Sequence, residues 1–466
     1  MIGMKYLLIY PPTEYYSISK TSSLSVPTVP PLGVLYLARA LENINNDVEI
    51  IDYNSEKVSY EKLQKAVNTA DFIGISILTI SLQKAKELIQ QIREIDPKKP
   101  IIIGGPHCSL YPERTLLETG ANICVEGEGE HTICDISQSF EGKKPLLEIQ
   151  GIYYKNEKNE IKKGPPPVLI NNIDQILFPS HHLVKKYRYG QIINPKLHGG
   201  KFTSIITSRG CPHRCRYCTR HFFGMNKCRF RSVQNIIDEL KDLQNTGYQY
   251  VFIADDSFLS NPPREHQIMD EIIKEKLHFE FFIQGARVDT ADEKLYKKLK
   301  DAGVKAIGFG LESGNQDVLD FYHKNITIDQ IRKAVTLCRK TRIFTFGSFI
   351  LGAPFETKEH FKNTIKFAYS LPLDSVTFYP LEYRAGSDLW IEAIKDGKIN
   401  PDEYIVISDS KRGLGRYPKD EIIRYCKKAQ RTFHFRPTHL IDEFMLACIK
   451  KDFTFIKAGF NFIKLI

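Results

Sequence analysis

The sequence predicts an α/β protein in which a doubly wound domain is followed by a partial barrel. Two stretches in which short apolar strands alternate with helical segments predict this class, because such alternation builds parallel sheets covered by helices. The first stretch covers residues 1–140, and the second begins at residue 203 with a longer period. The 466 residues are also too many for one ordinary core. We therefore expect four regions, at 1–144, 145–200, 201–390 and 391–466.

The first region is expected to form a flavodoxin-like or Rossmann-like sheet. Five apolar runs predict strands at 5–10, 48–53, 72–78, 100–103 and 122–125, and apolar residues at helical spacing predict helices over 31–42, 60–67 and 82–95. Small residues follow the later strands, among them Ser76, Gly104 and Gly105. Ligands of such domains bind at the carboxyl ends of the strands. These positions are therefore candidates for a ligand site, although any doubly wound domain needs small residues at such turns.

The second region is expected to be a connector. Residues 151–154, followed by a charged turn, predict a hairpin, and the run Gly164-Pro165-Pro166-Pro167 excludes a regular helix or a central strand.

The third region is expected to form a partial (β/α)6 barrel of the TIM-like type. Strands are predicted at 203–207, 250–254, 280–284, 306–310, 345–351 and 375–379, and helices at 233–244, 263–276, 291–302, 327–340 and 359–368. The loops after the carboxyl ends of the strands build the active site of such barrels. The fourth region is expected to be mainly helical, with its last helix either docked on the barrel or lying at a membrane interface.

Three cysteines stand in the loop after the first strand of this barrel. Cys211, Cys215 and Cys218 have C-x3-C-x2-C spacing. Three thiolates can hold three irons of a cubane cluster and leave the fourth iron open for a ligand. A zinc site would need a fourth ligand, for which the nearby candidates are His213, His221 and Cys228. The other cysteines are scattered among apolar residues, as expected for reduced thiols in a core.

The cysteine motif resembles the signature of the radical S-adenosylmethionine (SAM) superfamily, including the aromatic residue Tyr217 before the third cysteine. In that family the open iron of a 4Fe-4S cluster binds the amino and carboxylate groups of SAM. An electron from the reduced cluster then splits the sulfonium and gives methionine and a 5′-deoxyadenosyl radical. The resemblance thus implies that the three cysteines ligate a catalytic cluster, with Tyr217 beside the cofactor.

The resemblance also implies roles for residues at the later strand ends of the barrel. Glu312 and Ser313 would contact the amino group and ribose of SAM, Arg287 its carboxylate, and the backbone near Gly352 its adenine. Asp255 and Asp256 would lie near the reaction centre. The same residue types also suit helix caps and a structural ion pair.

Residues 1–140 resemble a cobalamin-binding domain. Ser76-Ile77-Leu78 matches the S-x-L element and Gly104-Gly105 the GG element, which in that family hold the dimethylbenzimidazole tail. The D-x-H-x-x-G element, whose histidine ligates cobalt, is not found, since the second strand is followed by Asp52-Tyr53-Asn54-Ser55-Glu56-Lys57. Cobalamin-dependent radical SAM enzymes commonly lack this histidine. The resemblance therefore implies base-off cobalamin without a histidine ligand, or a domain that has lost cobalamin.

Positive charge is concentrated around the cysteine motif. The chain has a formal net charge of +10, and residues 175–237 contain no Asp or Glu. Cations near a thiolate-ligated cluster stabilise it and make it easier to reduce, and they also attract anionic substrates. No recognisable nucleic-acid-binding module accompanies them. The cations in this stretch are Lys185, Lys186, Arg188, Lys196, Lys201, Arg209, Arg214, Arg216, Arg220, Lys227, Arg229 and Arg231.

The two resemblances together imply an enzyme that works without oxygen, cleaves SAM at the cluster and uses cobalamin to methylate an unactivated carbon. The expected partners are a small-molecule or lipid-like substrate, which the cations suggest is anionic, and a low-potential electron donor such as ferredoxin or flavodoxin. Two alternatives remain open. One is a cyclase or rearrangement enzyme with the same cofactors, and the other is a corrinoid-binding regulatory module with an inactive barrel.

The sequence also predicts where the protein resides. It has neither a secretory signal at its start nor an apolar run of about 18 residues, so we expect a cytoplasmic protein. The tail at 453–466 mixes phenylalanine with lysine, which suits peripheral contact with a membrane.

Overall fold

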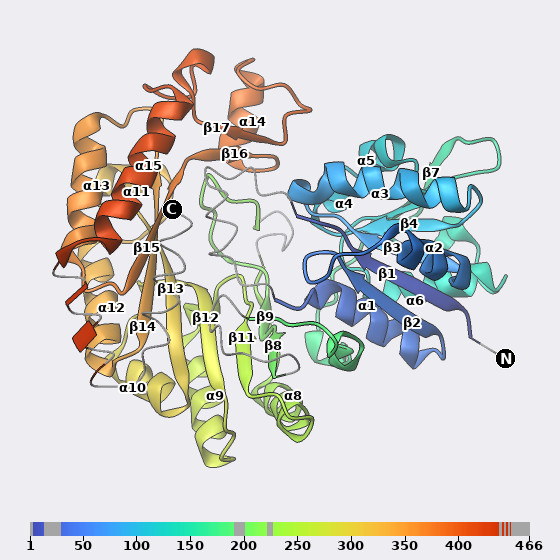
Figure 1. Ribbon diagram of the computed structural model, residues 1–466, viewed down its shortest axis with the longest axis horizontal. Helices are drawn as coiled ribbons and strands as arrows, with labels where there is room; N and C mark the ends of the chain where they lie inside the picture. The colour runs from blue at the N-terminus through green and yellow to red at the C-terminus, as the bar shows by residue number, and fades with distance from the viewer. Residues whose placement is uncertain are drawn as a thin grey trace. The chain divides into compact units, whose positions relative to one another are not determined.

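The computed structural model describes residues 3–13, 29–190, 201–220 and 227–437, and the single positions 440, 441, 444, 445 and 448. These residues form two compact units (Figure 1). The first unit holds most of the chain up to Gly190, and the second holds most of the chain from Lys201 onward. The boundaries expected at residues 144, 200 and 390 stay predictions.

The first unit is built on a seven-stranded sheet in the order β2-β1-β3-β4-β5-β6-β7. The first five strands in the chain run parallel, and the hairpin expected from the charged turn extends the sheet in antiparallel fashion. The strands are β1 (Lys5–Tyr10), β2 (Asp47–Asp52), β3 (Phe72–Ser76), β4 (Ile101–Gly104), β5 (Ile123–Val125), β6 (Ile152–Lys155) and β7 (Ile161–Lys163).

Helices cover both faces of this sheet, as a doubly wound domain requires. Two helices pack on each other on one face, namely α1 (Leu32–Asn43) and α6 (Glu130–Phe140). The other face carries α2 (Tyr60–Thr69), α3 (Leu82–Ile95) and α5 (Pro112–Thr119), and the short α4 (Pro106–Leu110) directly follows β4 (Figure 1). The predicted flavodoxin-like or Rossmann-like arrangement is confirmed.

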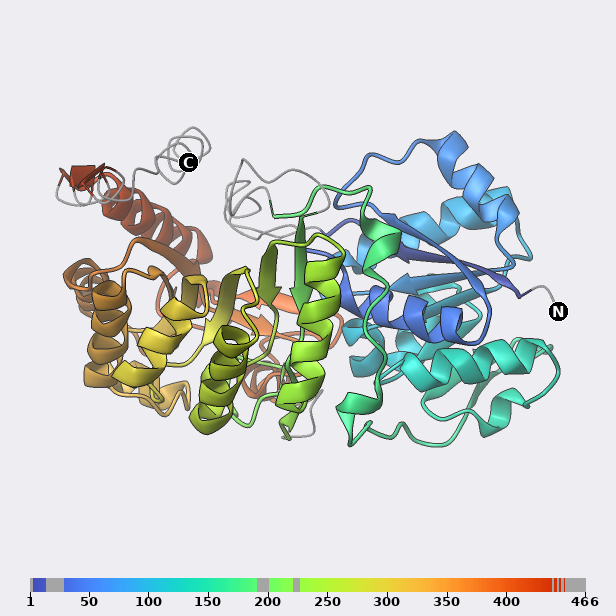
Figure 2. The same cartoon turned by 90° about the horizontal axis from the view of Figure 1, so that it is seen from below.

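The second unit contains a six-stranded parallel sheet whose strands lie side by side in chain order. Helices line its outer side, which is the arrangement of a partial barrel (Figures 1 and 2). The strands are β8 (Phe202–Ile205), β11 (Tyr250–Ile253), β12 (Glu280–Ala286), β13 (Val304–Glu312), β14 (Phe344–Leu351) and β15 (Ser375–Pro380). The helices are α8 (Val233–Asn245), α9 (Pro262–Lys274), α10 (Glu293–Asp301), α11 (Gln316–Phe321), α12 (Ile328–Thr341), α13 (Lys358–Ser370) and α15 (Lys419–His434).

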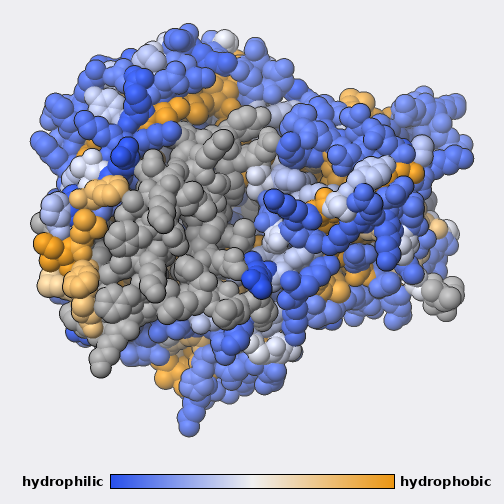
Figure 3. Space-filling model, in the orientation of Figure 1, coloured by the Kyte–Doolittle hydropathy of each residue, from blue (hydrophilic) through white to orange (hydrophobic). Residues whose placement is uncertain are grey.

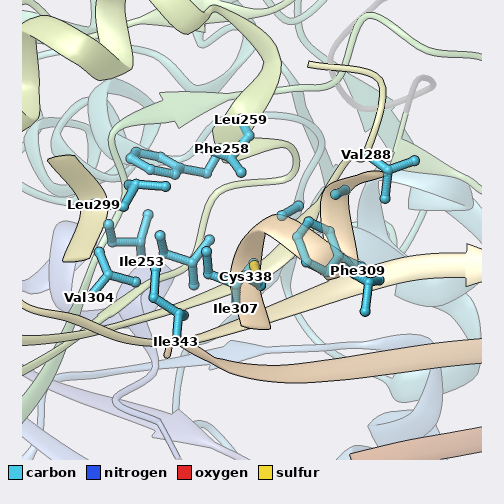
Figure 4. Packing of buried hydrophobic residues seen from close by; sticks show 14 of the residues in the cluster. Ile253, Phe258, Leu259, Val288, Leu299, Val304, Ile307, Phe309, Cys338 and Ile343 are labelled. Atoms are coloured by element: carbon cyan, nitrogen blue, oxygen red, sulfur yellow. The ribbon is translucent and has the colours of Figure 1, made fainter. Parts of the chain in front are cut away.

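Local sequence explains why these elements form where they do. Every second residue of β14 is buried, which is the pattern of a strand with one face in the core. Side chains of β11, β13 and α10 meet in the core between sheet and helices, as Ile253, Phe309 and Leu299 show (Figure 4). Capping boxes at Thr327 and Thr357 begin α12 and α13.

The C-terminal region is mainly helical, as expected, and its first part adds a small antiparallel sheet. The sheet pairs β16 (Glu382–Arg384) with β17 (Ile405–Ile407), with α14 (Asp388–Lys395) between them. Helix α15 then packs against β15 at the edge of the barrel sheet. In the part of the chain that the structure describes, no helix combines the length and apolar character needed to cross a membrane.

Candidate functional site

The cysteine loop starts from a short two-stranded ladder at the carboxyl end of β8. Strand β9 (Ser208–Arg209) pairs antiparallel with β10 (Arg229–Phe230), and the three cysteines lie in the chain between them. Gly210 has a φ of +89°, which favours glycine, and its N–H donates to the Asp256 carboxylate at 3.2 Å. The ladder therefore fixes both ends of the loop, while residues 221–226, which include the candidate His221, lie outside the described residues.

Arg216 anchors the middle of the loop to two other parts of the unit. Its N–H donates to the Tyr322 carbonyl at 3.0 Å, and its carbonyl accepts from the Leu389 N–H at 3.0 Å. Its guanidinium lies 4.4 Å from the centre of the Phe321 ring and pairs with Glu392 at 2.5 Å. A loop bound at its ends and its middle holds its cysteines in a defined arrangement.

The Cys218 thiol acts electrostatically on the other two thiols. Burial raises the pKa of the Cys211 and Cys215 thiols, and the neighbouring Cys218 raises both further. Cys215 is buried, whereas the other two thiols are partly exposed. No three His, Cys, Asp or Glu side chains within the described ranges are gathered closely enough to hold a single metal ion. A cubane takes each thiolate at a different iron, so its ligands do not converge on one point.

A buried charged cluster lies beside Cys215. Glu312, at the end of β13, pairs with Lys324 at 2.7 Å and accepts the Tyr217 hydroxyl at 2.8 Å. Both side chains of the ion pair are less than 10% exposed. Burial lowers the pKa of Lys324, but the Glu312 carboxylate and the Cys215 thiol outweigh that effect and raise it. Burial also raises the pKa of Tyr217.

The backbone around this cluster is strained. Glu312 has a φ of +62°, and the two neighbours of Lys324, His323 and Asn325, have φ values of +51° and +54°. Residues with side chains rarely adopt this region, and such strain persists only where surrounding contacts hold it. The ion pair and the hydrogen bond from Tyr217 are contacts of that kind.

Arg287, the predicted partner of the SAM carboxylate, lies in the same neighbourhood. Its guanidinium pairs with Asp289 at 2.9 Å and donates to the Lys324 carbonyl at 2.9 Å. It is close enough to Cys211 and Cys215 to lower the pKa of both thiols. Arg287 therefore holds the turn that carries Lys324, and its contact with SAM stays a prediction.

Two of the other predicted residues have their side chains engaged within the unit. The buried Asp255 accepts hydrogen bonds of 2.5 to 2.6 Å from Thr207 and Ser208, and burial raises its pKa. The Ser313 hydroxyl is fully buried against Thr364 at 3.1 Å. These contacts brace the strand ends, and the predicted cofactor contacts of both residues stay predictions.

Gly352 begins a tight loop after β14 that Glu356 stabilises. The Glu356 carboxylate accepts the N–H groups of Gly352 at 2.6 Å and Ala353 at 2.7 Å. Glu356 is fully buried, and burial raises its pKa to about 7 despite these two hydrogen bonds. The loop predicted to meet adenine is thus held from inside the unit.

The basic stretch is partly neutralised by carboxylates that lie later in the sequence. Four of its arginines pair with acids, in the pairs Arg214–Asp388, Arg216–Glu392, Arg220–Asp256 and Arg231–Glu239. The last pair is almost fully buried. Lys196 lies outside the described residues. Charge around the cysteine loop is therefore less positive than the sequence suggests.

In the first unit the structure brings the S-x-L and GG elements together. The Ile77 N–H donates to the Gly104 carbonyl at 2.7 Å, so the two elements lie directly beside each other. A Cβ atom on Gly105, whose φ is +99°, would lie only 3.0 to 3.1 Å from the backbone of Ile77 and the hydroxyl of Ser76. Ser76, Leu78 and both glycines remain partly exposed at this edge of the sheet.

These features fit the two implied cofactors. Three neighbouring thiols on a fixed loop provide the donor set of a cluster with one open iron. Partly exposed small residues at the carboxyl ends of β3 and β4 leave a backbone edge that a flat ligand can approach.

Sequence reasoning missed Lys324 and Glu356. No local motif marks Lys324, which follows α11 and meets Glu312 only in the fold. Glu356 carries a weak sequence signal, because it stands four residues after Gly352, the glycine predicted to contact SAM.

Comparison with known families finds both parts of the chain. Residues 205–368 match the radical SAM superfamily, and residues 25–137 match the B12 binding domain. A protein of Pyrococcus horikoshii named as an uncharacterized methyltransferase is 32% identical over 447 residues, which cover 94% of each chain. The anaerobic magnesium-protoporphyrin IX monomethyl ester cyclase of Cereibacter sphaeroides is 25% identical over 92% of this chain and 72% of its own length.

Comparison with solved structures finds the same two-part fold. The radical SAM methyltransferase TsrM of Kitasatospora setae, solved with cobalamin and a 4Fe-4S cluster bound, superposes with a TM-score of 0.69. The alignment covers 84% of this chain and 75% of that one at 18% sequence identity. At this identity the likeness concerns the fold.

Proposed function

The chain belongs to the cobalamin-dependent radical SAM methyltransferases, and we propose that it methylates an unactivated carbon of a small-molecule or lipid-like substrate. Its cofactors are a 4Fe-4S cluster, SAM and cobalamin. When bound, the cluster supplies the electron that cleaves SAM, and cobalamin supplies the methyl group. The observation that carries the proposal is the three-cysteine loop, fixed at the carboxyl end of β8 beside the buried Glu312–Lys324 pair.

We assign the following tasks to the chain's own residues. Cys211, Cys215 and Cys218 hold the three ligated irons, and the ladder of β9 and β10 keeps their loop in place. The Lys324 ammonium offsets the negative charge that a thiolate-ligated cluster brings into a buried site. Tyr217 stays protonated next to Glu312, because burial and the nearby carboxylate both raise its pKa.

Aromatic side chains pack beside the cysteine loop. The Tyr322 ring is fully buried 5.2 Å from the Tyr217 ring in an edge-on contact, and the Phe321 ring packs 5.3 Å from Phe355. Exclusion of water and oxygen protects reactive intermediates from side reactions. This packing supports chemistry on carbon that is otherwise unreactive.

The comparisons bear on the reaction, and the charges around the cysteine loop bear on the substrate. The relative with 32% identity is named a methyltransferase, which favours methyl transfer over cyclisation. The cations that suggested an anionic substrate are partly paired with carboxylates, so an anionic substrate stays a prediction. A radical SAM enzyme also needs an electron donor, and we propose a low-potential ferredoxin or flavodoxin.

The test uses anaerobic protein reconstituted with cluster and cobalamin, and SAM that carries a deuterated methyl group. Formation of 5′-deoxyadenosine is measured first, followed by deuterium in the products formed from a small-molecule extract. The Cys215→Ala variant is the matched control, and it should give neither signal. Cleavage of SAM without deuterium in any product would favour cyclisation or rearrangement. No cleavage by fully loaded protein would favour the regulatory module.

We also propose that the C-terminal end of the chain contacts an anionic lipid surface. Beyond α15, the described residues Leu440, Ile441, Phe444 and Met445 have 45 to 57% of their surface exposed. Hydrophobic surface is visible on the side of the molecule where α15 ends (Figure 3). The sequence of the last 18 residues contains four Phe and four Lys but one Asp, a composition that suits anionic headgroups. The predicted tail at 453–466 itself lies outside the described residues.

Vesicle binding tests this contact. The wild type should sediment with vesicles that contain phosphatidylglycerol, and the double variant Ile441→Ser, Met445→Ser should remain in the supernatant. Leu177→Ser, which removes an apolar side chain of 45% exposure from the first unit, is the control and should sediment like the wild type. Equal sedimentation of all three proteins would overturn the proposal, because Ile441 and Met445 would then contribute nothing to vesicle binding.

A further inference from the structure

The loop after β2 occupies the place at which the D-x-H-x-x-G element would stand. Counted from Asp52, Asn54 takes the position of the cobalt-ligating histidine. We propose that Asn54 is a positioning residue whose side chain forms a brace between the loops after β1 and β2. Hydrogen bonds from Tyr187 and Tyr189 hold this brace in place. The loop after β2 thereby binds cobalamin without supplying a ligand to cobalt. This inference rests on cobalamin being the ligand of the first unit.

The Asn54 side chain is hydrogen-bonded to the loop after β1. Its Oδ1 accepts hydrogen bonds from the Thr13 N–H at 3.0 Å and the Thr13 hydroxyl at 2.9 Å, and its Nδ2 donates to the Pro11 carbonyl at 3.0 Å. Pro11 and Thr13 follow β1 directly. Three of the four hydrogen bonds available to an Asn amide are therefore used between the two loops. A histidine ring cannot reproduce them. One nitrogen of a neutral imidazole accepts a single hydrogen bond and the other donates one, whereas the Asn54 amide accepts two and donates one.

Asp52 continues the brace into the interior of the unit. Its carboxylate is 1% exposed and accepts the Asn54 N–H, the Ser55 hydroxyl and the Tyr189 hydroxyl, each at 2.9 Å. Oδ1 accepts the Asn54 N–H and Oδ2 accepts the two hydroxyls, so loss of the Tyr189 hydroxyl removes one of the two donors to Oδ2 in a dry site. The loop conformation thus depends on a tyrosine 137 residues further along the chain.

Tyr187 secures the other side of the same loop. Its hydroxyl lies 2.6 Å from the Glu56 carboxylate and 3.1 Å from the Ile50 carbonyl, and it accepts the Asp52 N–H at 3.3 Å. Glu56 also pairs with Lys62 at the start of α2. The segment at 187–189 therefore contacts the β2 loop at both of its acids.

A loop held in this way is ordered before the ligand arrives. Preorganisation improves affinity because binding then does not have to order the loop. By contrast, the S-x-L and GG elements offer partly exposed backbone at the same edge of the sheet. Cobalamin thus contacts a preordered loop on one side. The Asn54 amide, which stands in place of the histidine, is hydrogen-bonded to Thr13.

Cobalamin affinity, thermal stability and an electron paramagnetic resonance (EPR) spectrum together test the brace. The dissociation constant is measured by titrating cobalamin into otherwise intact protein with its cluster in place. The Asn54→Ala variant should bind about tenfold more weakly, since binding would then have to order the two loops that the Asn54 side chain connects. Tyr189→Phe should weaken binding in the same direction by a smaller factor. Tyr60→Phe, which alters an exposed tyrosine at the start of α2, should bind like the wild type.

The EPR spectrum of bound cob(II)alamin reports an axial nitrogen ligand directly. We expect no nitrogen splitting in the wild type, in Asn54→Ala or in Asn54→His, and weaker binding by both variants. An Asn54→His variant that binds with unchanged affinity and shows nitrogen splitting would overturn the inference. A lower melting temperature of Asn54→Ala with an unchanged dissociation constant would overturn it too. Wild-type protein that takes up no cobalamin would instead remove the ligand assignment on which the inference rests.

Discussion

The replacement of Lys324 by Met should destabilise the second unit by about 3–5 kcal/mol, the usual cost of removing one partner from a buried ion pair. The Lys324 Nζ lies 2.7 Å from Glu312 Oε1, and the two side chains are 9% and 7% exposed. At an effective dielectric constant of about 20, two unit charges at this separation attract by about 6 kcal/mol. Desolvation of both ions offsets part of that attraction, but Lys324→Met leaves the carboxylate buried without its cation.

A double-mutant cycle with Glu312→Gln isolates this interaction. The double variant should be less destabilised than the two single variants taken together, with a coupling energy of about 2 kcal/mol or more. The matched control is Lys298→Met, because Lys298 pairs with Asp270 at 2.6 Å but lies at the surface. Exposed pairs contribute at most about 1 kcal/mol. The two lysines thus differ mainly in burial.

Denaturant unfolding followed by tryptophan fluorescence suits this measurement. The chain has one tryptophan, Trp390, which is buried in α14 and therefore reports on the second unit. Because Glu312 is a predicted SAM contact, Lys324→Met should also weaken SAM binding. A coupling energy near zero, or an equal loss of stability in Lys298→Met, would refute the argument that the buried pair holds this strand end.

Three further predictions concern other parts of the molecule. Cys215→Ala should abolish SAM cleavage because an iron ligand is lost, whereas Cys228→Ala should retain cleavage. The iron content and the yield of 5′-deoxyadenosine measure the difference. Equal loss in both variants would favour a four-cysteine site. Gly105→Val should weaken cobalamin binding and leave cluster absorption intact, because its Cβ would meet the Ile77 carbonyl at 3.0 Å and its φ is positive; loss of both signals would indicate misfolding. Burial raises the pKa of Glu356 from 4.5 to about 7, so between these pH values the folded state holds a proton that the unfolded chain releases. The free energy of unfolding should therefore fall by up to about 3 kcal/mol between pH 4.5 and 7 and stay level above pH 7. Glu356→Gln should remove this pH dependence of the melting temperature, and an unchanged slope would show that another group causes it.

The fold was largely predictable because its signals are local. Each predicted strand of the barrel overlaps an observed one, since apolar runs between turn residues mark buried parallel strands. The largest extensions lie at β12 and β13, which reach 286 and 312 instead of 284 and 310. Those added residues include Glu312, whose positive φ no strand propensity encodes.

The site was predictable only where its residues are neighbours in the sequence. The spacing of the cysteines identifies their chemistry, and the structure adds the contacts that hold the loop. The role of Lys324 could not be read from sequence, because it meets Tyr217 from a turn 107 residues away. The same limit applies to charge: Asp388 and Glu392, which pair with arginines of the loop, lie in α14.

The buried ion pair accounts for the strained backbone at the end of β13. A positive φ costs a residue with a side chain roughly 1–2 kcal/mol, and Glu312, His323 and Asn325 all adopt one. The contacts that keep them there are the Glu312–Lys324 pair and the hydrogen bond from Arg287 to the Lys324 carbonyl. The geometry of this strand end therefore depends on side-chain charges as much as on the sheet. A change that removes the Lys324 charge should consequently relax the backbone at Glu312 and move its carboxylate, even though the strands beneath it remain in place.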